Sequence, residues 1–446
     1  MYGGRSSDAM EPMVFGILRG LTPPEHECVL FDERLEEIPL DDETDLVAIT
    51  VETFTARRSY QIASEYVKRG VPVVMGGYHA TFCPQEALQF ANSVVVGESE
   101  LAWPQILRDA SRGEMQRVYK GQLAGLDEVT IDRSIFAGKK YRPIKLVQFG
   151  RGCKYACDFC SIHAFYGNNL RWRNVDQIVE ELSTSKRPFV FLIDDNLFND
   201  RERLKELLKA IRPLRIHWNC QASIDVAADQ ELVQLMADSG CLSVLVGFES
   251  LVEQNLKQMK KSWQRKYGTF DDLVQVFRDH GIMVYGTFVL GYDHDTPDSF
   301  KITLDFALRN KFFLANFNPL APTPGARLYD RLKSEGRLIR DPWWLDPDFR
   351  YGDTMFQPRG MTPDQLKEGC YWARTEFNRA TNILRRATDF RANLRSPLHA
   401  AAFALSNFTS RKEIHSKQGR SLGVEGLELQ PMFEPDAGSE ERVCIG

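Results

Sequence analysis

The sequence lacks the features of a membrane-spanning or exported protein. No run reaches the roughly 18 apolar residues that span a bilayer. Residues 1–12, MYGGRSSDAMEP, contain no apolar stretch of the kind an export signal needs. The net charge of −5 gives no basic excess for binding nucleic acid. We therefore expect a cytoplasmic protein with no transmembrane segment and no nucleic-acid partner.

Cysteine is also scarce, with nine in 446 residues, and a disulfide framework is not expected. Three of the nine, Cys153, Cys157 and Cys160, lie together in the stretch GRGCKYACDFCSI. A structural zinc site normally takes four ligands, often from two C-x2-C pairs, and the next cysteines, Cys220 and Cys241, stand alone. Three thiolates can instead bind three irons of a [4Fe–4S] cluster and leave the fourth iron open to a substrate.

The first part of the chain alternates short β-branched strands with helices. Strands are expected at 28–31, 46–51, 71–77 and 93–98, with a helix over 55–70 that ends at a glycine. This alternation predicts a parallel, doubly wound α/β sheet. Only the loop-like YGGRSSDA precedes the first helix, so the first strand is missing from this sequence or the sheet is one strand short.

The alternation restarts at residue 143 and predicts a second parallel sheet. Six strands are expected, at 144–150, 189–196, 216–223, 242–250, 281–291 and 312–322. Six such units fit a partial (β/α)6 barrel, whose chemistry lies at the carboxyl ends of the strands. The expected domains are 1–125, a Rossmann-like domain; 143–340, the barrel; and 341–446, a mainly helical region with a polar tail.

The C-x3-C-x2-C motif after the first barrel strand, with Phe159 before its last cysteine, resembles the signature of the radical S-adenosylmethionine (SAM) superfamily. The resemblance implies that Cys153, Cys157 and Cys160 hold a [4Fe–4S] cluster. It also implies that SAM chelates the open iron and is cleaved to a 5′-deoxyadenosyl radical. A coincidental group of thiols and a zinc site are the alternatives.

Strand ends carry the other residues that the resemblance assigns to SAM. Asp194 and Asp195 stand where the superfamily has a polar turn for the SAM amino group, and Glu249 could contact the ribose or that amine. The alternatives are a solvated loop with a helix cap for the aspartates and a structural role for Glu249. The full set of expected SAM contacts is Phe159, Asp194, Asp195, Glu249, Gly291, Pro324 and Gly325.

The stretch VVMGGYHATFCPQEAL, followed by VVVGESE, resembles the cobalamin-binding domain that precedes many radical SAM barrels. A plain Rossmann-like domain is the alternative. The resemblance assigns cobalamin contacts to Gly76, Gly77, His79, Gly97 and Glu98. His79 could be an axial ligand, but a lone histidine in a turn is more often a hydrogen-bonding group.

The sequence also indicates how the lower face of cobalamin is ligated. Many corrin-binding domains supply a histidine from D-x-H-x-x-G, but here Asp8 is followed by Met10 at the ligand position, and no histidine precedes His26. His26 comes before the strand expected at 28–31, which places it at the edge away from the ligand crevice. We therefore predict that cobalamin binds without a histidine from this chain.

Together these patterns predict a cobalamin-dependent radical SAM enzyme, a C-methyltransferase acting on an unactivated carbon of a small-molecule or lipid-like substrate. Two alternatives stay open: a radical SAM cyclase, rearrangement or C–H functionalising enzyme without methyl transfer, and a non-catalytic corrinoid sensor. An electron donor such as flavodoxin or ferredoxin is expected as a partner. The segments DPWW (341–344) and MFQPRGMT (355–362) resemble the region beside substrate in related proteins, with simple packing as the alternative.

Overall fold

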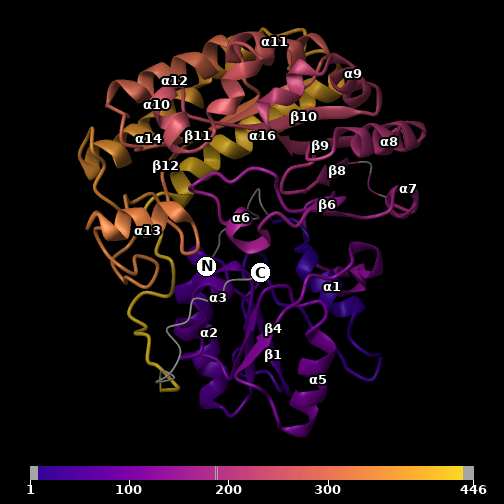
Figure 1. Ribbon diagram of the computed structural model, residues 1–446, viewed down its shortest axis with the longest axis vertical. Coiled ribbons are helices and arrows are strands. Elements are labelled where there is room, and N and C mark those ends of the chain that lie inside the picture. Colours follow the sequence, from indigo (N-terminus) through magenta and orange to yellow (C-terminus); the bar gives the residue numbers. More distant parts are fainter. Residues whose placement is uncertain (1–8, 186, 188, 435–446) are drawn as a thin grey trace.

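The computed structural model describes residues 9–434, apart from residues 186 and 188. The chain forms two parallel sheets in two separate units. The first sheet comes from the N-terminal part of the chain and lies at the bottom of Figure 1, and the second comes from the middle of the chain and lies at the top. No helix in the described ranges is long and apolar enough to span a membrane.

The first sheet has four parallel strands in the order β1-β2-β3-β4. The strands are β1 (Val47–Thr50), β2 (Val73–Gly76), β3 (Ser93–Val96) and β4 (Val118–Lys120), and the helices are α1 (Met13–Gly20), α2 (Ala56–Lys68), α3 (Tyr78–Phe82), α4 (Pro84–Ala87) and α5 (Trp103–Arg112). Apolar clusters cover both faces, with α2 and α3 on one side and α1 and α5 on the other. The α/β class of this unit is therefore confirmed.

Three details of the predicted first sheet differ in the structure. Residues 28–31 form no strand, because Leu30 packs against Phe136 and Tyr141 in a small cluster outside the sheet while Val29 is exposed. The strand β4 was not expected, since only one of its three side chains is buried. The described strands also follow one another in chain order, so this sheet lacks the reversal of order that a doubly wound sheet has.

The second sheet has six parallel strands in the order β12-β11-β10-β9-β8-β5, and all six predicted strands are confirmed. They are β5 (Ile144–Val147), β8 (Phe189–Leu192), β9 (His217–Ala222), β10 (Cys241–Glu249), β11 (Met283–Leu290) and β12 (Leu314–Pro319). A short hairpin pairs β6 (Gly150–Arg151) with β7 (Arg171–Trp172). The helices are α6 (Ser161–Tyr166), α7 (Val175–Ser183), α8 (Arg201–Ile211), α9 (Gln230–Asp238), α10 (Glu253–Gln258), α11 (Phe270–Asp279), α12 (Asp298–Arg309) and α13 (Arg327–Ser334).

Burial and capping explain this partial barrel. Alternate residues of the strands are buried against the helices, and the largest apolar cluster of the protein forms there. Several helices begin at a side-chain cap: Asp200 accepts from two backbone N–H groups of α8, and Thr269 accepts from one of α11. The carboxyl ends of the six strands therefore have a fixed position, which is where the site is built.

The C-terminal region contributes α14 (Pro363–Phe377), α15 (Ala380–Ala387) and α16 (Pro397–Lys417), so its mainly helical character is confirmed. The fully buried guanidinium of Arg386 anchors α15 by donating to the carbonyl oxygens of Phe312 and Phe313 and to Asn407 Oδ1. The polar tail from residue 435 onward lies outside the described residues.

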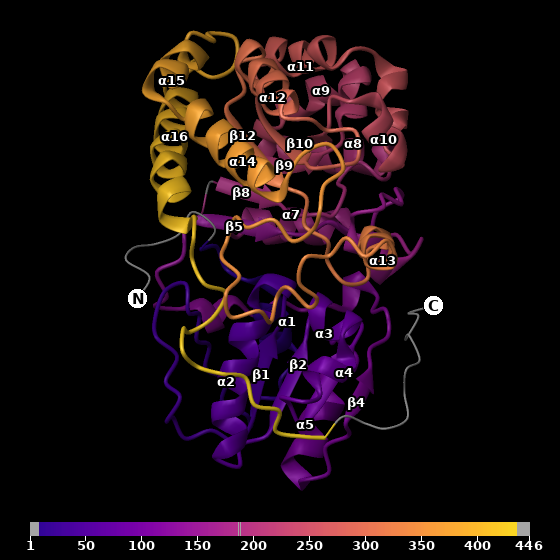
Figure 2. The same cartoon turned by 90° about the vertical axis from the view of Figure 1, so that its left-hand side faces the viewer.

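Two further C-terminal segments return to the first sheet. Trp343 and Trp344 are buried in the apolar cluster on the α2 face, which favours the packing interpretation of DPWW. Residues 418–433, here called the C-terminal strap, then run along α2 (yellow in Figure 2). Arg57 and Gln61 of α2 both donate to the carbonyl oxygen of Leu427. The strap therefore completes the cover of the first sheet.

Candidate functional site

The three clustered cysteines lie on residues 152–160, here called the thiol arm, which leaves β6 at the carboxyl edge of the second sheet. The arm starts at Gly152, whose φ of +92° and close approach to Asn169 O, 2.5 Å from an added Cβ, admit only glycine. It ends at Cys160, where α6 begins. The sequence thus places three thiols on a short irregular segment between two fixed points.

The loop after β8 holds this arm in place. Asp195 Oδ2 accepts from Gly152 N (2.8 Å), and Asn199 both donates to Gly152 O (2.7 Å) and accepts from Lys154 N (3.0 Å). Asn196 Nδ2 lies 3.7 Å from Cys153 Sγ. The polar turn that the sequence indicated therefore positions the arm as well as facing the site.

The two aspartates of that turn differ in availability. Both carboxylate oxygens of Asp194 accept backbone hydrogen bonds, from Phe149 N (2.7 Å) and Gly150 N (2.6 Å), and burial raises the pKa of Asp194 to about 7. Asp195 uses one oxygen on Gly152, and burial raises its pKa as well. Asp195 is thus the aspartate with an oxygen left for a ligand, while Asp194 fixes the backbone before the arm.

The cysteines themselves are half-buried and form no disulfides. Burial raises the pKa of all three thiols, that of Cys157 to about 12, and the ammonium of Lys261 opposes this shift. No three His, Cys, Asp or Glu side chains of the described chain converge on a point that would hold one metal ion. A [4Fe–4S] cluster joins each cysteine to a different iron, so it fits this wider arrangement better than a zinc ion does.

Glu249 ends β10 with a left-handed backbone (φ +63°), a strained conformation for a residue with a side chain. Lys261 stabilises it: its Nζ donates to Glu249 Oε1 (2.7 Å) and to Gly247 O (2.9 Å). Gln264 donates to the same carbonyl oxygen (3.0 Å). The carboxylate of Glu249 is thereby held at the strand end, beside the thiol arm.

The remaining expected SAM residues lie on the same edge of the second sheet. Phe159 is half-buried and packs against the large apolar cluster. Gly291 follows β11 at φ +108°, where Asp295 accepts its N–H. Gly325, after Pro324, has φ +83°, and an added Cβ would meet the ring of Phe82 at 2.5 Å. Gly325 therefore marks a close contact with α3 of the first sheet.

The expected cobalamin residues lie at the carboxyl edge of the first sheet. Gly77 follows β2 at φ +98°, and an added Cβ would meet Val51 O at 2.8 Å. Gly97 follows β3 at φ +100° beside Gly121. At the end of β1, Glu52 is exposed at the same edge. Two strand ends without side chains leave room for a large ligand such as a corrin.

Two of the expected cobalamin residues are already occupied by protein partners. His79 is fully buried, with Nδ1 3.2 Å from Thr53 Oγ1 and Nε2 3.0 Å from Glu86 Oε1, so neither ring nitrogen is free for a metal. Glu98 accepts from Arg171, Arg151 and the backbone N–H of Ala124. These residues hold the edge together rather than presenting a free ligand atom.

The carboxyl edges of the two sheets face each other. Tyr78 of α3 packs its ring edge-on against Phe165 of α6, with 4.7 Å between centroids. An ion-pair network, here called the interface network, joins the loop after β3 to the hairpin before the thiol arm. It consists of Glu98, Glu100, Arg151 and Arg171, with N–O distances of 2.5–2.9 Å. Both candidate sites therefore share one interface.

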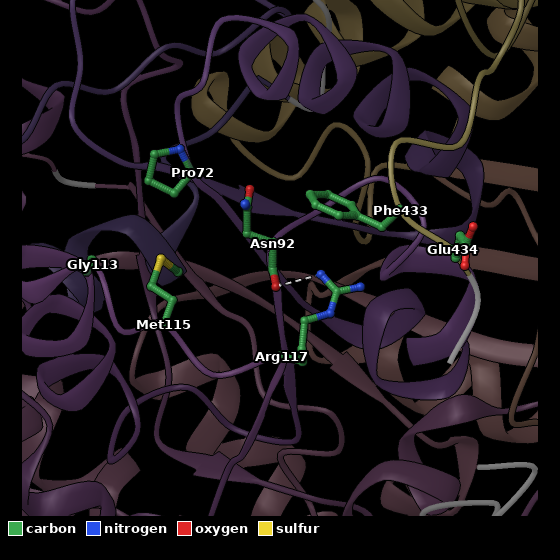
Figure 3. Close-up of a pocket in the computed structure, with 8 residues that line it drawn as sticks. Pro72, Asn92, Gly113, Met115, Arg117, Phe433 and Glu434 are labelled. Carbon is green, nitrogen blue, oxygen red and sulfur yellow. Dashed lines mark hydrogen bonds between the residues drawn. The ribbon is translucent and has the colours of Figure 1, made fainter. Parts of the chain in front are cut away.

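A surface pocket of about 470 Å³ lies away from this interface (Figure 3). Pro72, Asn92 and Arg117 line it, and each directly precedes a strand, so the pocket is at the amino edge of the first sheet. Arg117 donates to Asn92 O (2.9 Å) and lies over the ring of Phe433 from the C-terminal strap. This pocket plays no part in the candidate site.

Several residues of the site could not be found from motifs. Lys261, Arg151 and Arg171 belong to no recognised pattern, and their carboxylate partners are distant in sequence. Asn196 and Asn199 follow Asp194 and Asp195 directly, so their position after a strand end was the one available signal.

The fold and the thiol arm define an iron–sulfur protein built on a partial (β/α)6 barrel. The pattern of the Radical SAM superfamily matches residues 147–307, which contain the whole arm and the four strands β8, β9, β10 and β11. With the relative described next, this match shows that the chain belongs to the radical SAM superfamily, whose members use SAM and a [4Fe–4S] cluster.

Two curated relatives come from Chlorobaculum tepidum. Bacteriochlorophyllide d C-12(1)-methyltransferase is 30% identical over 375 residues, covering 81% of this chain and 81% of the relative. Bacteriochlorophyllide d C-8(2)-methyltransferase is 29% identical over 354 residues, covering 74% of this chain and 78% of the relative. Among solved structures, the cobalamin-dependent SAM radical enzyme OxsB, with aqua-cobalamin and SAM bound, has a TM-score of 0.60 at 15% identity. That similarity covers 84% of this chain and 64% of OxsB, and it concerns the fold.

Proposed function

We propose that this protein is a cobalamin-dependent radical SAM C-methyltransferase. The observation that carries the proposal is the shared interface: the thiol arm at the edge of one sheet faces the glycine-bearing edge of the other. A cluster with SAM on one side and a corrin on the other would then be close enough to act on one substrate. The relatives named as methyltransferases support methyl transfer as the outcome.

The residues of the chain divide into three groups in this proposal. Cys153, Cys157 and Cys160 would hold the cluster, and Asp195 and Glu249 would bind polar groups of SAM. The strand ends at Gly76, Gly77 and Gly97 would leave room for the corrin. When bound, SAM and the cluster supply a 5′-deoxyadenosyl radical and the corrin supplies methyl transfer.

The protein also orients these groups and excludes water. Asp194 fixes the backbone before the arm through Phe149 and Gly150, and Asp195 fixes the start of the arm through Gly152. The aromatic contact of Tyr78 with Phe165 closes one side of the interface. The cytoplasm is the proposed location, because thiols that hold a cluster require a reducing compartment. By analogy with the relatives, the substrate would be a small apolar or lipid-like molecule.

The decisive experiment is anaerobic reconstitution with iron, sulfide and cobalamin, followed by identification of the SAM-derived products. A methyltransferase of this type forms both 5′-deoxyadenosine and S-adenosylhomocysteine. Formation of 5′-deoxyadenosine alone, with or without cobalamin, would favour the non-methylating radical enzyme. Absence of SAM cleavage in protein with a full cluster would favour the sensor.

The SAM contacts are tested separately by Asp195→Ala and Glu249→Ala. Loss of a hydrogen bond to a charged amine costs about 1.5–3 kcal/mol, or about ten- to hundredfold in SAM affinity. Iron and sulfide contents should stay at the wild-type level, since neither side chain is proposed to bind iron and Asn199 still holds the arm at Gly152 and Lys154 in Asp195→Ala. Unchanged SAM affinity in both variants would assign the two residues a purely structural role.

A further inference from the structure

A basic segment lies directly against the thiol arm. Residues 257–266, KQMKKSWQRK, carry five cations and no carboxylate in a chain whose net charge is −5. The segment covers the end of α10 and η6 (Ser262–Tyr267), and Met259 O accepts from Asp158 N of the arm (3.4 Å). The positive charge of this segment is therefore concentrated beside the three cysteines.

The cations of this segment have different environments. Lys261 is buried on Glu249, and Lys257 pairs with Glu253. Lys260 and Lys266 are exposed and have no ion-pair partner within the described chain. Arg265 is also exposed and stacks on Phe270, with Glu253 and Asp271 as the carboxylates that influence it. Lys154 of the arm adds another exposed cation.

An aromatic pair connects the arm to this surface. Tyr155, between the first and second cysteines, stacks face to face on Trp263 with 3.9 Å between centroids and 7° between planes. The ammonium of Lys154 lies 5.4 Å from the Tyr155 centroid, and Tyr267 is exposed nearby. The surface thus combines two half-buried stacked rings and the exposed Tyr267 with cations around them, immediately outside the thiol arm.

We propose that this surface, formed by Tyr155, Lys260, Trp263, Arg265, Lys266 and Tyr267, is the docking site of an acidic, low-potential one-electron carrier protein. The inference rests on the proposed function, because a cluster that cleaves SAM must first receive one electron. One electron leaves the reduced flavin or iron–sulfur centre of the carrier and enters the [4Fe–4S]²⁺ cluster, giving [4Fe–4S]⁺ and the oxidised carrier. Complementary charge steers such encounters and makes their rate depend on salt.

The test is stopped-flow reduction of the reconstituted holoenzyme by the hydroquinone form of flavodoxin, an acidic carrier, at increasing ionic strength. The double variant Lys260→Glu/Lys266→Glu should lower the second-order rate constant at low salt by about tenfold or more and remove most of its salt dependence. Reduction by dithionite, a small reagent that needs no docking surface, should keep its wild-type rate.

The matched control is Lys209→Glu/Lys412→Glu, which reverses two exposed lysines on α8 and α16 and leaves the net charge equal to that of the test variant. An equal loss of rate in this control would overturn the assignment, because it would reflect total charge alone. A test variant with an unchanged flavodoxin rate, or one slowed equally with dithionite, would also overturn it.

Cluster content is measured before each reduction experiment. A full cluster that accepts electrons from dithionite but never cleaves SAM would contradict the proposed function. The rates of reduction by flavodoxin would still test the docking surface in that case. The two proposals can therefore fail independently.

Discussion

The three cysteines of the thiol arm have neighbours that the other described cysteines lack. Cys153, Cys157 and Cys160 lie near the ammonium of Lys261. Cys220 and Cys241 face each other inside the apolar core, and Cys370 is buried there as well. We expect Cys153→Ala, Cys157→Ala and Cys160→Ala each to abolish the visible absorbance of the cluster and all SAM cleavage.

The control for this prediction is Cys83→Ala, since Cys83 is half-buried like the arm cysteines but lies in the first unit. Cys28, Cys220, Cys241, Cys370 and Cys444 should be replaceable without loss of the cluster; Cys444 lies outside the described residues. Iron and sulfide at wild-type levels in Cys157→Ala would refute the assignment.

His79 gives a prediction about bound cobalamin. Both of its ring nitrogens have protein partners, and Glu86 also accepts hydrogen bonds from Tyr60 and Trp344, which fixes that carboxylate. We therefore expect electron paramagnetic resonance of the cob(II)alamin form to lack nitrogen splitting from the protein, and His79→Gln to leave the spectrum unchanged. A nitrogen splitting that disappears in His79→Gln would show that the histidine rotates to the metal.

For single residues, the sequence identified those that lie in a short motif or at a strand end. The cysteines and Asp195 follow from spacing and from position after a strand. The occupied state of Asp194 and Glu98 could not be foreseen, because their partners are backbone N–H groups and arginines from other elements. The places of Lys261 and Glu52 near the candidate sites likewise follow from folding and not from a motif.

Between elements, Asp293 joins α10, α13 and the segment after α13. Burial opposes ionisation, but hydrogen bonds from Gln258, Arg337 and Arg331 lower the pKa of Asp293 to about 2. A carboxyl whose pKa is lower in the folded state stabilises the fold above the unfolded pKa of about 4, and this stabilisation is lost as the pH falls toward 2.

We expect Asp293→Asn to lower the free energy of unfolding by about 1 kcal/mol at pH 7, after allowance for solvent screening at this partly exposed site. Chemical denaturation between pH 7 and pH 3 should show the difference from the wild type shrinking below pH 4. Asp305→Asn, in an exposed pair with Lys301, is the control and should change little. A difference that is constant across this range would contradict the assigned pKa.

Element prediction from the sequence succeeded where burial is continuous and failed where it is not. The six strands of the second sheet have long apolar patterns, and all were found. The segment 28–31 has the composition of a strand, but Leu30 packs in a cluster outside the sheet. The strand β4 pairs with β3, but its exposed Lys120 and half-buried Val118 give it no apolar pattern. The composition of a segment shows only whether its side chains suit a sheet. Whether the segment pairs depends on the strand that lies beside it in the fold.

At the scale of the whole molecule, the interface network joins the two sheets by ion pairs, and we expect it to couple their unfolding. Glu98 is buried and pairs with both Arg151 and Arg171, so its neutralisation takes the carboxylate from Arg171 and leaves Arg151 with Glu100. We expect Glu98→Gln to destabilise the protein by about 3 kcal/mol, because breaking a buried ion pair is costly. Calorimetry should then resolve a separate, earlier transition for the first sheet.

Glu114→Gln removes an exposed carboxylate from the same unit and serves as the control. A single transition in Glu98→Gln at the wild-type temperature would mean that apolar contacts such as that of Tyr78 with Phe165 are enough to couple the sheets.

The C-terminal strap has a consequence for biogenesis. Its contacts join Arg57 and Gln61 to residues 424–427, so more than three hundred residues emerge from the ribosome between the two partners. N-terminal units usually fold first during synthesis. Here the α2 face of the first unit stays uncovered until Trp343, Trp344 and the strap have been synthesised. Nascent chains would therefore expose this face to chaperones while more than three hundred further residues are made, and closure of the first unit would wait for the strap.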